Sequence, residues 1–504
     1  MQQLEIRLNE PGFTPLHRAG VAGMFLTLQQ LGKEQIEPPG KFAWELERDR
    51  VKLYWDGNDF EIFDWLFKQS FLLDDEGMIR FKAFDSQLDL ESSKAMGRDV
   101  QCLFHNAIMG TFLRHRTKYE GIPSEPGSKT KNKMAEKFLP VEDSQVRIAY
   151  KPLQGYSHQN FASDICSQNG LNSSVTIGGW LYPSGIVRHR KGSEIQEPIK
   201  NALALVFAPI ACYYFKISSK KMTTKANYVL VVPHFESLPA FVLFKKELHL
   251  KHVTYKDFHA GGLGDAGLKF LSSDAAIRLS KDVGLMGCEV TTFGKVGWSP
   301  QSVVTSFLRV EASDRLCRNY RIATDALSDR VCHKKDGDIW VDTNFIREQV
   351  VDNLVNNAHW YSGFANLVSS SEKWQQTKYL RSGLIKMTEQ MTWTDQDDQL
   401  LLIAFKEALR NYYGRKSSGG QLDYPKVSDK LLYKVNRIKS GAGFRSFAVN
   451  FMANNKPAKT LIAHSQLWDA IRSTNPVRWK KNKDLFVLAI AVYSGKNNGN
   501  DEEE

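Results

Sequence analysis

The segment TDQDDQLLLIAFKEALRNYYG, residues 394–414, carries the clearest helical pattern in this chain of 504 residues. Its apolar side chains recur at three- and four-residue spacing, which is typical of one face of an amphipathic helix. Thr394 can cap the first turn, acidic residues follow where the helix dipole favours negative charge, and Gly414 can end the last turn. The pattern therefore predicts a helix over residues 394–414.

Helical patterns continue on both sides of this segment, and no strand pattern competes with them. The sequence therefore predicts a helical bundle over residues 341–504, which ends in an acidic tail. Besides the central helix, the bundle is expected to contain helical residues within 342–368 and helices at 427–438, 443–452, 461–474 and 483–492.

The preceding residues, 1–340, show a mixed pattern. Residues 51–67 contain two alternating apolar runs around Asp56-Gly57-Asn58, which predicts a β-hairpin. Residues 202–217 and 228–235 are continuous apolar runs of the kind found in buried strands. Long helices do not alternate regularly with these runs, which disfavours a doubly wound parallel sheet. We therefore expect an α+β fold, with a large mixed α/β N-terminal domain over residues 1–340 followed by the all-α bundle.

The positive charge of the chain is concentrated near its C-terminus. The formal net charge is +11, and between Lys406 and Asn500 the sequence has 18 Lys and Arg against five Asp and Glu, a surplus of +13. Such a surplus favours an anionic partner, most often nucleic acid. The bundle is therefore the expected site of contact with a polyanion.

Cysteine spacing and hydropathy indicate a cellular compartment. The six cysteines form no C-x-x-C pair, so they are interpreted as buried thiols in a reducing environment. The longest apolar run, residues 202–215, is too short to cross a bilayer and contains Pro209. We expect a soluble, cytoplasmic protein with no membrane partner.

The glycine-rich stretch GGLGDAG, residues 261–267, matches G-x-G-x-x-G. A dinucleotide site needs an apolar strand directly before this motif, whereas HVTYKDFHA precedes it here. A flexible loop whose backbone amides can approach a phosphate is the favoured interpretation. No P-loop, metal-ligand spacing or nucleophile elbow occurs in the sequence, so we predict no cofactor, no bound metal and no enzymatic activity.

Basic residues interleaved with aromatic residues are the stronger functional pattern. Each neutralised phosphate adds salt-dependent affinity, and an Arg or aromatic plane can stack on a base. A solvated surface is the alternative explanation for any single run. The candidate nucleic-acid-binding residues are Lys129, Lys131, Lys133, Arg188, Arg190, Lys191, Gly262, Gly264, Lys434, Arg437, Lys439, Arg445, Arg478, Lys480 and Lys481.

Three stretches carry a resemblance to a known family: RLNEPGFTPLHRAGVAGM (7–24), GGWLYPSGIVRH (178–189) and AHWYSGFANLV (358–368). Together they resemble the large subunit of type I CRISPR Cascade, in the MYXAN subtype of the Cas-eight family. The resemblance implies a ribonucleoprotein complex for antiviral defence, in which the large subunit lies at the 5′ end of the crRNA. There it recognises the protospacer-adjacent motif in duplex DNA and aids R-loop formation.

The resemblance also implies partners and roles. The expected partners are crRNA, target double-stranded DNA, the backbone, guide-end and small subunits, and an effector that is either a helicase–nuclease or a transposition adaptor. Residues 1–340 would anchor the guide end and sense the flanking motif, with Arg188, Arg190, Lys191, the lysines at 129–133 and the 261–267 loop as candidates. The bundle, which resembles the small subunit, would contact DNA.

His17 and Arg18 raise the question of catalysis, because both lie in an apolar helical segment. They follow the Pro11-Gly12 turn and lead into small residues that allow close helix packing, so we interpret the pair as architectural. Two other functions stay open at this point: a stand-alone metal-dependent nuclease and a simple RNA-binding protein.

Overall fold

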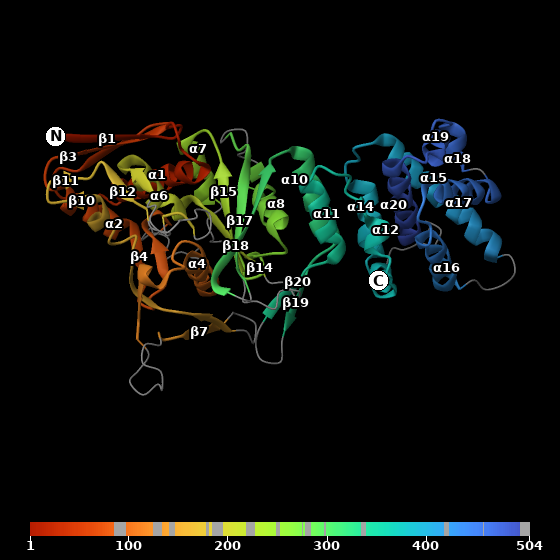
Figure 1. Cartoon of the computed structure of the whole chain (residues 1–504), viewed down its shortest axis with the longest axis horizontal. Coiled ribbons are helices and arrows are strands. Elements are labelled where there is room, and N and C mark those ends of the chain that lie inside the picture. Colours follow the sequence, from red (N-terminus) through yellow and green to blue (C-terminus); the bar gives the residue numbers. More distant parts are fainter. Residues whose placement is uncertain are drawn as a thin grey trace. The chain divides into compact units, whose positions relative to one another are not determined.

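The computed structural model of the chain divides into two compact units. Unit 1 comprises Met1–Asp314 and Arg330–Asp342, and unit 2 comprises Arg315–Asp329 and Thr343–Glu504. All described strands belong to unit 1, and unit 2 is helical, so the expected α+β fold is confirmed (Figure 1). The structure describes residues 1–84, 97–123, 134–140, 147–177, 181–183, 195–217, 227–247, 253–274, 276–277, 284–296, 299–333, 339–417, 423–456 and 458–493.

A three-stranded antiparallel sheet opens unit 1. Its order is β1 (Gln2–Arg7), β3 (Arg50–Trp55), β2 (Ala43–Leu46). The hairpin predicted over 51–67 is wrong, because α2 (Asp59–Ser70) follows β3 directly. The Asn58 side chain accepts hydrogen bonds from the backbone N–H groups of the first helical turn, and such a cap favours a helix over a turn between strands.

Close packing of α1 (Pro15–Lys33) against α6 (Ile199–Ala211) forms the core of unit 1. A Cβ atom added to Gly20 would lie 1.7 Å from the carbonyl oxygen of Ala204, so the two backbones touch where α1 lacks side chains. The small residues that follow His17 and Arg18 therefore allow close helix packing, as predicted. The strand predicted over 202–217 is wrong up to Ala211, since an apolar run alone does not distinguish a buried helix from a buried strand, and only residues 213–217 form a strand.

A five-stranded sheet forms the second part of unit 1, with β15 (Asn227–His234) at its centre. The strand predicted over 228–235 is thereby confirmed. Only β14 and β16 pair in parallel among the strands of this sheet. The order is β16 (His259–Ala260), β14 (Tyr213–Ile217), β15, β17 (Gly287–Val296), β18 (Ser299–Glu311).

The predicted glycine loop at 261–267 is wrong, because α8 (Leu263–Leu271) begins inside it. The Asp265 side chain accepts a hydrogen bond from the backbone of Gly261 at 2.8 Å and fixes the first turn. Gly267 lets the helix approach β17 and β18, since an added Cβ would lie within 3.0 Å of Val290 and Val310.

The remaining elements of unit 1 are short strand pairs and helices. The helices are α4 (Arg98–Thr111), α5 (Ala162–Ile165) and α7 (Leu238–Glu247), with 3₁₀ turns at Lys82–Phe84 and Arg116–Lys118. The strands are β4 (Phe71–Leu73), β5 (Ile79–Phe81), β6 (Tyr119–Gly121), β7 (Lys137–Pro140), β8 (Arg147–Tyr150), β9 (Leu153–Tyr156), β10 (Cys166–Ser167), β11 (Gly170–Leu171), β12 (Ser174–Thr176), β13 (Gln196–Pro198), β19 (Arg330–His333) and β20 (Ile339–Asp342).

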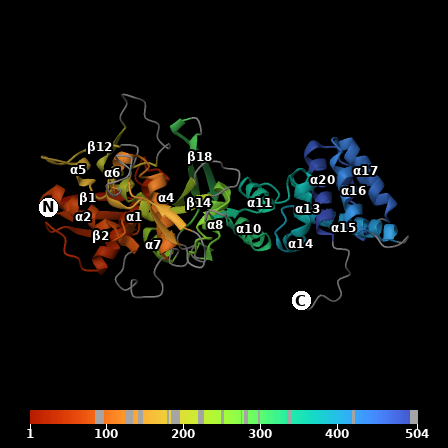
Figure 2. The same cartoon turned by 90° about the horizontal axis from the view of Figure 1, so that it is seen from below.

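Unit 2 is built around its last helix. In α20 (Pro476–Val492) every residue from Leu485 to Val492 is buried, and Figure 2 shows α15, α16 and α17 around it. The other helices are α10 (Asp314–Ala326), α11 (Phe345–Val355), α12 (Phe364–Leu367), α13 (Ser371–Tyr379), α14 (Arg381–Gln390), α15 (Gln396–Ser417), α16 (Tyr424–Asn436), α17 (Gly441–Asn454), α18 (Lys459–Ala463) and α19 (Leu467–Arg472).

The helix predicted at 394–414 is confirmed as α15, with corrected ends. Asp395, rather than Thr394, accepts the hydrogen bond from the first turn, at 3.0 Å from the backbone N–H of Asp397. Gly414 lies inside the helix, which continues to Ser417. None of the helices among the described residues has the length and apolar character needed to cross a membrane.

Candidate nucleic-acid interface

A cluster of exposed cations lies where α16 meets α17 in unit 2. Lys434, Arg437, Lys439 and Arg445 are all exposed. Helix ends hold the connecting segment in place: Arg437 is the C-cap of α16, and the Ser440 hydroxyl accepts a hydrogen bond from Gly443 at the start of α17. Four of the predicted residues therefore gather within one short, ordered stretch.

A groove of about 510 Å³ opens beside this stretch. We call it the bundle groove, and it lies between α16 and the segment that joins α12 to α13. Arg437 and Lys439 line it, together with Lys483 from α20. Its other lining residues are Asn366, Ser369, Ser370, Ser371, Trp374, Gln375, Asp429, Leu432, Tyr433 and Asn436.

Lys483 is the buried cation of the bundle groove. Its ammonium donates to the carbonyl oxygen of Ile438 at 3.1 Å and so ties α20 to the basic stretch. Burial lowers the pKa of Lys483. An anion bound in the groove would stabilise the protonated, charged form of Lys483.

One acidic side chain lines the groove among the described residues, and it is occupied by contacts within the protein. The Asp429 carboxylate accepts hydrogen bonds from the Trp374 indole at 2.6 Å and pairs with the Lys378 ammonium at 2.8 Å. The cations of the groove therefore face little opposing charge, which favours a phosphate over a cationic ligand.

An aromatic surface borders the cations. Tyr433 is 65% exposed, and the Arg437 guanidinium lies 5.6 Å from the centre of its ring. Lys434 lies 5.7 Å from the Phe447 ring. Planar groups beside cations are the arrangement with which proteins hold single strands, by stacking on bases and neutralising phosphates.

Arg478 and Lys481, both predicted contact residues, are held inside unit 2. Asp398 is fully buried, and its carboxylate lies 2.9 Å from Arg478 Nη1 and 2.8 Å from Lys481 Nζ. Asp395 pairs with the same two cations, at 3.5 and 2.9 Å. Residues 478 and 481 share one face of α20 because they are three apart, and that face meets the acidic start of α15. Lys480 points elsewhere and is exposed.

The predicted residues of the N-terminal domain do not add to this cluster. Six of them, Lys129, Lys131, Lys133, Arg188, Arg190 and Lys191, lie outside the described residues. Gly264 is buried within α8, and Gly262 stands at the helix start in an extended conformation.

His17 and Arg18 have structural contacts. His17 is 1% exposed, and its Nδ1 accepts a hydrogen bond from the backbone N–H of Thr14 at 3.1 Å, which caps α1. Burial lowers the pKa of His17 to about 4. Arg18 donates to the carbonyl oxygen of Phe235 at 2.8 Å and so joins α1 to the segment after β15.

The sequence did not indicate the rest of the bundle groove. Ser370 and Trp374, at the start of α13, are far in the chain from Lys483 on α20 and meet it only through helix packing. Of the missed residues, Tyr433 had a sequence signal, because it is an aromatic residue directly before the basic residue Lys434.

The chain matches known families at both ends. The family models are the DevT N-terminal domain, over residues 5–206, and the DevT C-terminal domain, over residues 389–504, which contains the groove residues of α16 and α20. A similar protein is the CRISPR-associated protein Cas8a1/Csx13 of Myxococcus xanthus (strain DK1622). It is 21% identical over 549 aligned positions, which cover 98% of this chain and 89% of the relative.

Proposed function

This chain belongs to the Cas8 family of CRISPR-associated large subunits, in the MYXAN branch that its DevT domains identify, and we propose that it acts without catalysis in a type I crRNA-guided surveillance complex. In this proposal, pairing between guide and target supplies sequence specificity. The protein reads the protospacer-adjacent motif, contacts DNA and offers a surface to the effector.

The bundle groove is proposed to hold the DNA strand that the guide displaces. The observation that supports this role is the exposed cluster of Lys434, Arg437, Lys439 and Arg445 beside the exposed Tyr433 ring. Opening the DNA costs about 1.4 kcal/mol of stacking per step, and the guide–target duplex that forms regains about as much, so the exchange is nearly balanced. A few phosphate contacts to the displaced strand are enough to shift that balance toward the open state.

Unit 1 is proposed to lie at the guide end and to sense the flanking motif. This assignment rests on the family, which places the large subunit at the 5′ end of the crRNA. Arg188, Arg190, Lys191 and the lysines at 129–133 stay the candidates for this contact. The other Cascade subunits, and a helicase–nuclease or a transposition adaptor as effector, complete the proposed set of partners.

The test is the salt dependence of single-stranded DNA binding by the full-length protein. The groove variant replaces by Gln the groove residues Arg437 and Lys439 together with Arg445, which is exposed near the start of α17. If all three contact phosphates, the slope of log affinity against log salt becomes shallower by about two to three.

A matched control replaces Arg410, Lys416 and Lys459, which are exposed on unit 2 and do not line the groove, by Gln. This control removes the same charge, so a long-range field effect would change both slopes equally. Equal changes, or no change in the groove variant, would remove the groove from the DNA path.

A further inference from the structure

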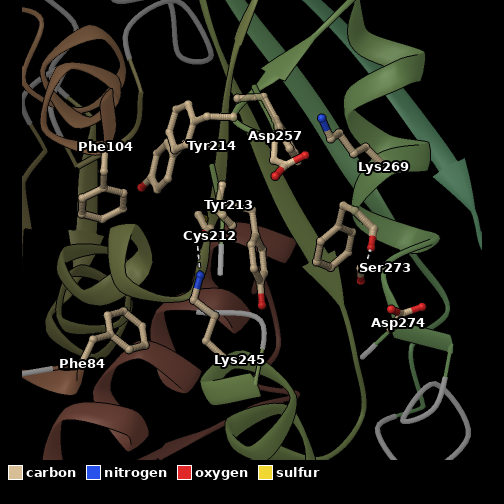
Figure 3. Close-up of a pocket in the computed structure, with 14 residues that line it drawn as sticks. Phe84, Phe104, Cys212, Tyr213, Tyr214, Lys245, Asp257, Lys269, Ser273 and Asp274 are labelled. Carbon is tan, nitrogen blue, oxygen red and sulfur yellow. Dashed lines mark hydrogen bonds between the residues drawn. The ribbon is translucent and has the colours of Figure 1, made fainter. Parts of the chain in front are cut away.

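Besides the bundle groove of unit 2, the protein has a cavity of about 430 Å³ in unit 1, between α4, β14, α7 and α8. This volume falls within the range of small-ligand sites, which are mostly apolar with a few convergent polar groups. Figure 3 shows Tyr213 of β14 between Phe84 and Phe104 on one side and Ser273 on the other. The aromatic side chains that line this cavity are Phe84, Phe104, Tyr213, Tyr214, Phe258 and Phe270, with Phe215.

A buried cation lies among these rings. Lys245, on α7, is 5% exposed, and its ammonium donates to the carbonyl oxygen of Cys212 at 2.6 Å. The same ammonium lies 3.5 Å from the centre of the Tyr213 ring. Burial lowers the pKa of Lys245 to about 7. An ammonium has three N–H donors, of which the Cys212 carbonyl takes one; its other neighbours are the Tyr213 ring and the Phe84 ring, whose centre lies 5.6 Å away, and a ligand carbonyl is a stronger acceptor than a ring face.

The Tyr213 hydroxyl is a second polar group at this cavity. Tyr213 is 8% exposed, and among the described residues its hydroxyl has no hydrogen-bond partner. A buried hydroxyl without a partner costs about 1–3 kcal/mol, so it is normally satisfied. The neighbouring Tyr214 also lines the cavity, but its hydroxyl donates to the carbonyl oxygen of Pro209 at 2.9 Å.

The charges at the cavity disfavour a phosphate ligand. Asp257 and Asp274 are exposed and line the cavity together with Lys269, whose ammonium donates to the carbonyl oxygen of His259 at 3.0 Å. These two carboxylates balance the ammonium groups of Lys245 and Lys269, so the cavity offers a phosphate no net positive charge. The aromatic rings and the inner polar pair instead suit a flat ring with hydrogen-bonding edges.

We propose that this cavity binds one unstacked nucleobase that carries a ring carbonyl. The base would stack on the aromatic side chains, its carbonyl would accept from Lys245, and its edge would hydrogen-bond the Tyr213 hydroxyl. Guanine, uracil and thymine offer a carbonyl beside an N–H, whereas adenine has no carbonyl. The inference rests on the proposed function, because a nucleic-acid-binding protein meets such bases in guide RNA or opened DNA.

Calorimetric titration of the full-length protein with uridine, guanosine and adenosine tests the site, and single-stranded RNA and DNA oligonucleotides identify the source of the base. We expect uridine or guanosine to bind and adenosine to bind at least about fivefold more weakly, as for the loss of one hydrogen bond to a charged donor. Absence of binding by all three nucleosides and both oligonucleotides, or equal binding of the three nucleosides, would overturn the proposal.

The variant Tyr213→Phe separates a ligand contact from a structural role. It removes an unsatisfied hydroxyl, so the ligand-free protein should keep or gain thermal stability while its affinity for the base falls about fivefold to tenfold. Tyr214→Phe is the control, because it removes a hydroxyl that is already bonded to Pro209 and should lower stability without changing affinity. Unchanged affinity in Tyr213→Phe would overturn the assignment.

Failure of the nucleobase site is distinguishable from failure of the bundle groove. Nucleosides carry no phosphate, so their binding is independent of Arg437, Lys439 and Arg445. Loss of nucleoside binding with an intact salt slope rejects only the cavity.

Discussion

Asp398 shows how a single carboxylate decides which cations of the bundle reach solvent. It is fully buried and satisfies Arg478 and Lys481, while the Tyr361 hydroxyl donates to it as well. Removal of one partner from such a group leaves buried charges without compensation, which is costlier than loss of an exposed pair. Of the basic residues between 478 and 481, Arg478 and Lys481 therefore stabilise the bundle, and Lys480 stays exposed.

We expect Asp398→Asn to lower the free energy of unfolding by about 3 kcal/mol, because Arg478 and Lys481 lose their shared charge. Urea unfolding followed by circular dichroism measures the change. Lys480→Gln, on the same helix but exposed, should change stability by less than about 0.5 kcal/mol. Equal effects of the two variants would show that the ion-pair network does not stabilise the bundle.

Asp484 makes the stability of unit 2 depend on pH. Its carboxylate accepts hydrogen bonds from Gly363 at 2.8 Å and Ala365 at 2.9 Å, and burial raises the pKa of this group to about 6. Between about pH 4 and pH 6 the folded protein keeps a proton that the unfolded chain has lost. The contribution of this group to stability therefore rises as the pH falls through that window.

We expect the wild-type protein to gain about 2 kcal/mol relative to Asp484→Asn when the pH is lowered from about 7 to about 4, since Asn does not titrate. Unfolding in urea at a series of pH values measures the difference between the two proteins. A difference that stays constant across the window would contradict the raised pKa.

At the scale of elements, the contact between α1 and α6 is set by glycine. Gly20→Ala would place a methyl group 1.7 Å from the Ala204 oxygen, and the helices must then separate. We expect a loss of about 3 kcal/mol, or failure to fold. Gly32→Ala is the control on the same helix, since its nearest neighbour, Trp44, lies at an ordinary 3.6 Å. Thermal unfolding should show this control as neutral or slightly stabilised.

The main helices of the bundle were predictable because their apolar residues recur at helical spacing, and α16 and α17 carry capping side chains, Asp423 and Ser440. The single helix predicted at 461–474 is wrong, because α18 and α19 are two short helices without capping side chains, and α20 begins at Pro476 rather than at residue 483. Two predictions for unit 1 were wrong because a contact outweighed the apolar pattern. The Asn58 cap favours α2 over the second strand of the predicted hairpin. Residues 199–211, predicted in part as a strand, form α6, which packs against α1. The ends of α15 were misplaced because Asp395 and Thr394 are both capable caps, and because exposed Gly414 is tolerated inside a long helix.

At the scale of the whole molecule, the basic surface of unit 2 was predictable from the sequence, whereas the bundle groove beside it was not. Lys434, Arg437, Lys439 and Arg445 are local in sequence, so their clustering was visible in the chain. The bundle groove also needs Ser370 and Lys483, whose approach depends on how α12, α13, α16 and α20 pack. The cavity at Tyr213 and Lys245 had no local signal, because both residues lie within apolar stretches.

We propose that the bundle groove holds the displaced strand in the guided complex. Permanganate footprinting of thymines in that strand, on the assembled complex with matched target DNA, reports whether the groove protects it. We predict that replacing Arg437, Lys439 and Arg445 by Gln leaves guide assembly intact and increases thymine reactivity or abolishes strand opening, whereas the Arg410, Lys416 and Lys459 variant behaves as the wild type. If the groove variant gives the footprint and the extent of opening of the wild type, the bundle groove does not hold the displaced strand.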